Sequence, residues 1–243
     1  MKKFATLLLI IALSTLLVQC KQNSGRQALY INENFIGIRQ DKTVKFYKTE
    51  DHIHWTHHPS KDFVSSNNPD DIFYFVSVFI GVRSGNTIKF YQTSSEGGWK
   101  YSPGKDLVCP ESVDGVFKFN DNTLGVKHGK TIKFYQTNLY GTWKPAATPS
   151  FTNSEDFDEA FALTSNYIGI REGRSVKFYT IDKLSRWSYR AAMSFLSPDN
   201  PDDIFYLGYG ALGVLNGKTV KFYPVNSQGE WAYDASKDFT FSN

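Results

Sequence analysis

Acidic residues recur every 44 residues along the chain, in segments rich in proline, serine and asparagine. They are Asp70, Asp114, Asp158 and Asp202, and the residue 44 positions before Asp70 is Arg26. A carboxylate in a loop can accept hydrogen bonds from the hydroxyl groups of a sugar. It can equally accept them from the backbone of its own turn. These aspartates are therefore candidates either for a ligand site or for turn caps.

Tryptophan and lysine recur at the same interval. The tryptophans are Trp55, Trp99, Trp143, Trp187 and Trp231, and the lysines are Lys45, Lys89, Lys133, Lys177 and Lys221. An aromatic ring can bind the apolar face of a sugar, and it can also fill the space between packed sheets. The lysines would present cations to an acidic ligand, or lay their stems along apolar neighbours. We take both sets as candidate ligand-binding residues, with the structural alternatives open.

Histidines cluster in the segment EDHIHWTHHPS, which begins at Glu50 and holds four of the five histidines of the chain. On an extended segment His52 and His54 share one face, so these two with His57 are candidates for a zinc site. The other repeats have no similar cluster, which favours a solvated loop. We expect no resident metal or cofactor.

Catalytic motifs are missing from the sequence. It has no nucleophile–histidine constellation, no glycine-rich phosphate loop and no cluster of cysteine ligands. A propeller glycosidase needs individually placed carboxylates around its central channel, and we identify none that interrupts the repeat. No long run of lysine or arginine suggests nucleic acid. We expect neither an enzyme nor a nucleic-acid-binding protein.

The N-terminus has the features of an export signal. Lys2 and Lys3 precede an apolar run from Phe4 to Val18, which is too short for a stable membrane span. The residues before Cys20 resemble a bacterial lipobox, although Gln19 stands where a small residue is usual. We expect residues 1–19 to be a signal peptide and Cys20 to be a lipidated first residue; the alternative is an ordinary secreted protein in which Cys20 is incidental. Its lipid would anchor the protein to a membrane of the bacterial cell envelope, in either leaflet.

Five repeats of 44 residues account for the rest of the chain, at about 24–67, 68–111, 112–155, 156–199 and 200–243. Each contains an aromatic segment, a glycine, a Lys-Phe-Tyr triplet and a tryptophan, which predicts four short antiparallel strands. We place the hairpin turn at Ser84-Gly85 in the second repeat, so that Gly81 lies opposite Ile88 and on the face of Phe90. Glycine there lets an aromatic ring approach closely.

This repeat length is typical of one propeller blade. We therefore predict an all-β fold, a five-bladed β-propeller. Ring closure is expected to pair the first strand, near residues 28–31, with the chain end near residues 238–241. The segment SEDFDEAFAL from Ser154 has the composition of a helix start, but the repeat aligns it with a strand.

The repeat resembles that of the tachylectin-2-like lectins, most clearly from Phe117 to Phe151, and the resemblance extends over residues 24–243. That family implies a five-bladed propeller that binds N-acetylhexosamines between blades. The family's Gly-Gly-Trp loop before the aromatic strand is replaced here by segments such as SNNPDDIF, from Ser66.

We expect a multivalent, lectin-like surface or periplasmic lipoprotein that acts as a monomer, and the resemblance implies glycans that contain N-acetylhexosamine as its ligands. The alternative is a propeller that binds an envelope or host protein, or has a structural role in the envelope, with no sugar ligand. Matched repeats favour the first hypothesis because many weak sites gain avidity on one rigid disc.

Overall fold

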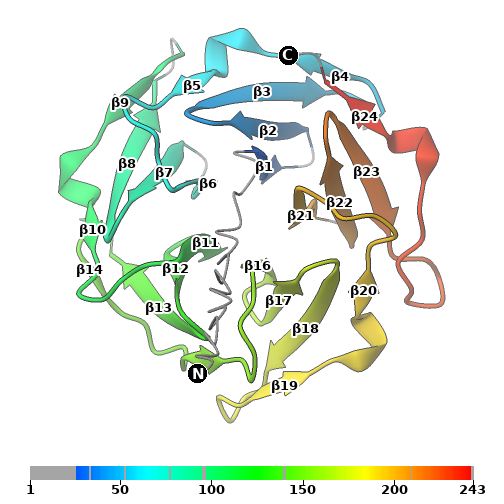
Figure 1. Ribbon diagram of the computed structural model, residues 1–243. Helices are drawn as coiled ribbons and strands as arrows, with labels where there is room; N and C mark the ends of the chain where they lie inside the picture. The colour runs from blue at the N-terminus through cyan, green and yellow to red at the C-terminus, as the bar shows by residue number, and fades with distance from the viewer. Residues whose placement is uncertain are drawn as a thin grey trace, which may run out of the picture.

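Each repeat folds into one antiparallel sheet in the computed structural model, which describes residues 26–241 apart from 33, 52, 77, 95–96, 139–140 and 209. The predicted signal peptide, Cys20 and His52 lie outside the described residues. Five such sheets form a ring of blades (Figure 1), so the predicted fold class is confirmed. Among the described residues, none of the helices has the length and apolar character needed to span a membrane.

The strands are numbered along the chain and grouped by blade as follows. Blade 1 contains β1 (Arg26–Asn32), β2 (Phe35–Gln40), β3 (Thr43–Thr49), β4 (Trp55–His57) and β5 (Phe63–Val64). Blade 2 contains β6 (Asp71–Tyr74), β7 (Phe79–Ser84), β8 (Thr87–Thr93), β9 (Trp99–Tyr101) and β10 (Leu107–Val108). Blade 3 contains β11 (Gly115–Asn120), β12 (Thr123–His128), β13 (Thr131–Thr137), β14 (Trp143–Pro145) and β15 (Phe151–Thr152). Blade 4 contains β16 (Glu159–Thr164), β17 (Tyr167–Glu172), β18 (Ser175–Ile181), β19 (Trp187–Tyr189) and β20 (Phe195–Leu196). Blade 5 contains β21 (Asp203–Tyr206), β22 (Ala211–Asn216), β23 (Thr219–Pro224) and β24 (Phe239–Thr240).

The outermost strand of blades 1 to 4 is divided into two short pieces, both paired with the third strand of the blade. A single 3-10 turn lies before the last strand in four blades: η1 (Pro59–Lys61), η2 (Pro103–Lys105), η3 (Ala191–Met193) and η4 (Ala235–Lys237). The segment from Ser154 that has a helix-like composition leads into β16, as the repeat predicted.

The glycine of each second strand lies under an aromatic ring, as predicted, although the register differs from our expectation. The two-residue loop of blade 2 is Gly85-Asn86, so Gly81 pairs with Phe90 and not with Ile88. On its other side Gly81 pairs with Phe73, whose ring lies directly over the glycine. A Cβ atom at Gly81 would fall 2.6 Å and 2.7 Å from two ring carbons of Phe73.

The hydrophobic core is divided among the five boundaries between blades. In every blade the phenylalanine of the Lys-Phe-Tyr triplet stacks on the tryptophan of the next blade, as Phe90 does on Trp143 at 5.5 Å and 20°. In four of the five blades the triplet tyrosine packs edge-on against a phenylalanine of the preceding blade, as Tyr179 does against Phe151 at 4.7 Å. The triplet and the tryptophan therefore recur because they join neighbouring blades.

Ring closure differs from the prediction. β1 pairs only with β2 and β24 pairs only with β23, so each blade comes from a single repeat. The chain ends meet through side-chain packing in a cluster that contains Ala28, Phe239 and Phe241. One backbone contact supports the closure, because the Ala28 amide donates to Asp203 at 2.7 Å.

Candidate functional site

The recurring aspartates cap the hairpin turn of their own blade. One carboxylate oxygen of each accepts the amide of the turn glycine, at 2.7 Å for Asp70, 2.6 Å for Asp114 and Asp158, and 2.8 Å for Asp202. These glycines have φ between +56° and +62°, a conformation that glycine adopts without steric cost. The geometry therefore favours the structural alternative for this set.

The tryptophan indoles also have a structural contact. In four of the five, Nε1 donates to a backbone carbonyl of the preceding blade, at 2.7–3.1 Å. Trp55 is the exception, since its buried Nε1 has no partner among the described residues. All five rings remain partly exposed at a blade boundary, and Trp143 lines a cavity there.

The lysines do not form a ring of unpaired cations. Lys133 pairs with Glu111 at 2.5 Å, Lys177 with Glu172 at 2.7 Å and Lys221 with Asp199 at 2.9 Å. The Glu111 carboxylate raises the pKa of Lys133 through a hydrogen bond to its ammonium group. Lys89 lies 5.5 Å from the centre of the exposed Tyr101 ring, and Lys45 lines the central cavity.

The histidines are held by separate carboxylates. His54 Nδ1 lies 2.5 Å from Asp51, and His57 Nε2 lies 2.9 Å from Asp62. Within the described part of the chain, no group of three potential ligands is placed to hold a metal ion.

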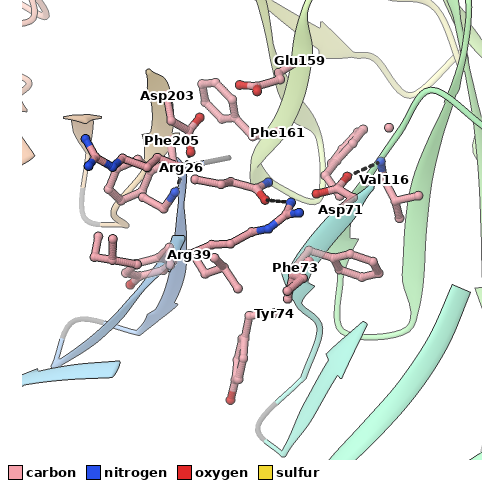
Figure 2. Close-up of a pocket in the computed structure, with 18 of the residues that line it drawn as sticks. Arg26, Arg39, Asp71, Phe73, Tyr74, Val116, Glu159, Phe161, Asp203 and Phe205 are labelled. Atoms are coloured by element: carbon pink, nitrogen blue, oxygen red, sulfur yellow. Dashed lines mark hydrogen bonds between the residues drawn. The ribbon is translucent and has the colours of Figure 1, made fainter. Parts of the chain in front are cut away.

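A cavity of about 900 Å³ occupies the ring centre, between the innermost strands of all five blades. Figure 2 shows Asp71, Glu159 and Asp203, from three different blades, around this cavity together with Arg39. These acids belong to one position of the repeat, which reads Gln27, Asp71, Gly115, Glu159 and Asp203. Our expectation that no carboxylate near the channel interrupts the repeat was therefore wrong.

Two of these channel acids join neighbouring blades. Asp71 accepts the Val116 amide at 3.2 Å, and Asp203 accepts the Ala28 amide. The arginines beside them have a similar role: Arg39 donates to the Pro69 carbonyl at 2.6 Å and Arg83 to the Val113 carbonyl at 2.8 Å. Most of the charge at the channel thus holds the ring together.

Glu159 differs, because it forms a hydrogen bond with the carboxyl group of Asp203. Protein surrounds both groups, although 29% of the Glu159 side chain remains exposed to the channel. Burial and the neighbouring Asp203 raise the pKa of Glu159 well above its ordinary value of 4.5, and burial raises the pKa of Asp203. The protonated form of Glu159, which can donate a hydrogen bond to Asp203, is therefore favoured by folding.

Glu159→Gln should raise the melting temperature, and the gain should be larger at pH 8 than at pH 5. A carboxyl group whose pKa is raised by folding contributes stability that is fully present below its unfolded pKa and is lost as pH rises through the folded value. Glutamine keeps a donor toward Asp203 without ionising. Thermal unfolding at both pH values tests this, with the exposed Glu155→Gln as control; equal gains at the two values would show that Glu159 ionises normally.

A second cavity, of about 420 Å³, lies between blades 2 and 3. Its apolar side is formed by Val76, Phe79 and Trp143, and its polar side includes Lys105 and Asn122. The Trp143 indole is fixed by its hydrogen bond to the Lys105 carbonyl at 2.7 Å. Aromatic rings beside amide and charged groups are the chemistry that suits a small polar ligand with an apolar face.

The five blade boundaries share one stacked aromatic pair but differ in the residues around it. The stacked phenylalanine and tryptophan are present in all five. The position of Phe79 is occupied by Phe35, Thr123, Tyr167 and Ala211 in the other blades, and that of Lys105 by Lys61, Pro149, Met193 and Lys237. Sequence reasoning identified Trp143 but missed Phe79, Lys105 and Asn122, because these positions vary between repeats.

The ring of five sheets defines a five-bladed β-propeller. No protein-family model and no curated protein matches the chain. Among solved structures, it is similar to a protein from Lactobacillus plantarum, with 10% identity, 83% of this chain and 67% of that chain covered, and a TM-score of 0.49. It is also similar to a functionally unknown protein from Desulfotomaculum acetoxidans DSM 771, with 11% identity, 89% and 70% covered, and a TM-score of 0.50. The second likeness supports the fold alone.

Proposed function

We propose that the protein binds carbohydrate in the grooves between its blades, and that the groove between blades 2 and 3 is the principal site. The observation that carries the proposal is the 420 Å³ cavity, in which Phe79 and Trp143 lie beside Asn122 and Lys105. A sugar presents an apolar face and a rim of hydroxyl groups, which matches rings flanked by hydrogen-bonding groups. The resemblance of the repeat to the tachylectin-2-like lectins supports the same location.

Because the stacked phenylalanine and tryptophan recur at all five blade boundaries, we extend the proposal to multivalent binding. Weak sites on one rigid ring gain avidity toward a polymeric glycan without any new contact. The residues around this pair differ between boundaries, so we expect the sites to differ in affinity. A lipid at Cys20 would place the ring at a membrane surface of the envelope, where glycans or a host protein are accessible; this anchor stays a prediction.

Phe79→Thr should weaken binding of the best ligand by about tenfold or more, because it removes the half-buried ring that would support the apolar face of the sugar. The blade should tolerate the change, since Thr123 occupies the same position in blade 3. A glycan-array screen of the purified protein followed by calorimetry measures the effect. Phe35→Thr, the matched change in the groove between blades 1 and 2, is the control and should have a smaller effect.

A screen with no bound glycan would exclude the proposal and leave a protein-interaction role. One observation favours that second function. Val64, Val108 and Leu196 are 61%, 68% and 62% exposed at corresponding positions of the outer strands, which places apolar side chains around the rim of the disc. A pull-down with the purified protein would then test for an envelope or host protein.

A further inference from the structure

Lys105 gives the groove between blades 2 and 3 a positive charge that no described carboxylate pairs with. Its ammonium group lies 5.1 Å from the centre of the Phe79 ring, in the same cavity. The acid of the groove, Asp121, is already paired with Lys118 at 2.8 Å and is 90% exposed. The groove therefore combines an aromatic surface with one available cation.

The backbone around Lys105 is held by the neighbouring blade. Its carbonyl accepts the Trp143 indole, and the loop of Gly141 passes so close that a Cβ atom there would lie 3.1 Å from the Lys105 Cγ and 2.7 Å from the Gly104 carbonyl oxygen. Gly141 has φ +83°, which glycine allows. The lysine stem is thus positioned between the two blades, and its ammonium group is directed over Phe79.

The other grooves lack this combination. Pro149 and Met193 replace the lysine at the next two blade boundaries. Blade 5 has Lys237 at the lysine position but Ala211 at that of Phe79, and Lys237 pairs with Asp234 at 3.8 Å. Lys61 has an aromatic counterpart in Phe35, but its ammonium group donates to Thr93 at 3.4 Å and the Phe35 ring is in edge contact with His58. We therefore expect a preference for negatively charged ligands only at the boundary of blades 2 and 3.

We propose that this groove selects an acidic sugar, one that carries a carboxylate on its ring, with Lys105 binding that carboxylate. When the apolar face of a hexose lies against the aromatic side of the groove, a carboxylate on the ring projects from its edge, where the Lys105 ammonium group can meet it. The lysine then exchanges its contact with Phe79 for a charge-assisted hydrogen bond, which is the stronger interaction. This inference rests on the proposed sugar-binding function and specifies its ligand.

Matched sugar pairs test the inference, because glucuronate and galacturonate differ from glucose and galactose only at C6. We expect calorimetry to show the acid bound about tenfold to a hundredfold more tightly than its neutral partner, with the preference reduced at 0.5 M salt. Lys105→Gln should abolish the preference, so that the acid and its neutral partner bind equally. Lys105→Arg should retain it, and Lys61→Gln should have no effect.

The possible failures separate the two proposals. Equal binding of the acidic and neutral sugars, lost in Phe79→Thr, would overturn the role of Lys105 and keep the sugar-binding function. A preference for the acid that survives in Lys105→Gln would also overturn it. No binding of any of the four sugars, with no hit on the glycan array, would overturn both.

Discussion

Trp187→Ala should lower the free energy of unfolding by about 3 kcal/mol, or roughly 6–12 °C in melting temperature for a chain of this size. The ring stacks on Phe134 at 5.9 Å and 18°, and meets Phe151 edge-on at 5.7 Å. Alanine would empty the wedge between blades 3 and 4 and leave the Pro149 carbonyl without its donor. The effect is below the upper range for tryptophan because the side chain is partly exposed. Urea unfolding followed by circular dichroism measures it.

A matched pair of phenylalanine substitutions isolates the hydrogen bond from the packing. Trp187→Phe should cost about 1–2 kcal/mol, since it leaves an unpaired acceptor between the blades. Trp55→Phe should cost less or be neutral, because it removes a buried N–H that has no partner among the described residues. Equal costs for the two variants would mean that the indole hydrogen bonds contribute nothing to holding the blades together.

The five-bladed fold was predictable because the repeat has no insertion or deletion. A spacing of 44 residues between every Lys-Phe-Tyr triplet identifies the blade, and the same frame correctly predicted a strand within the helix-like segment from Ser154, whose second half lies in β16. The hairpin register was not predictable to the residue, since Ser84, Gly85 and Asn86 are all suited to a turn. Ring closure was mispredicted because packing of side chains, and not strand pairing, joins β1 to the last blade.

The candidate sites were harder to predict because they depend on residues that differ between repeats. The repeated aspartates were candidate ligand-binding residues from the sequence, yet each caps a turn. The residue after each of these aspartates differs between repeats, and this position includes Glu159 and Asp203. These side chains come together only because the innermost strands of all five blades surround one cavity. Similarly, Phe79 and Asn122 belong to different repeats and come together only when blades 2 and 3 pack. Function in this ring is therefore expected where the repeat is interrupted, since the repeated residues already hold the blades.

Gly81→Ala should destabilise the protein by about 1–3 kcal/mol, the cost of overpacking a core. The added methyl group would enter the ring of Phe73, which is 6% exposed and meets Phe90 edge-on at 6.3 Å. Neither ring can move freely, because Phe90 also stacks on Trp143 of the next blade. Gly115→Ala is the control in the same kind of sheet. Its Cβ atom would meet Lys127 at ordinary contact distance, 3.7 Å, so we expect no loss and a gain of up to about 1 kcal/mol from the restricted unfolded chain.

Phe73→Leu should rescue Gly81→Ala, because it removes the ring atoms that lie over the glycine. The sheet accommodates leucine at this position, since Leu29 pairs with Gly37 in blade 1. Alone, Phe73→Leu leaves space over the glycine and is destabilising; combined, the two changes restore the volume. Their costs should therefore sum to more than the cost of the double variant, by about 1 kcal/mol or more. Additive costs would mean that the ring of Phe73 moves away from the new methyl group, and that the space over Gly81 is not what requires glycine there.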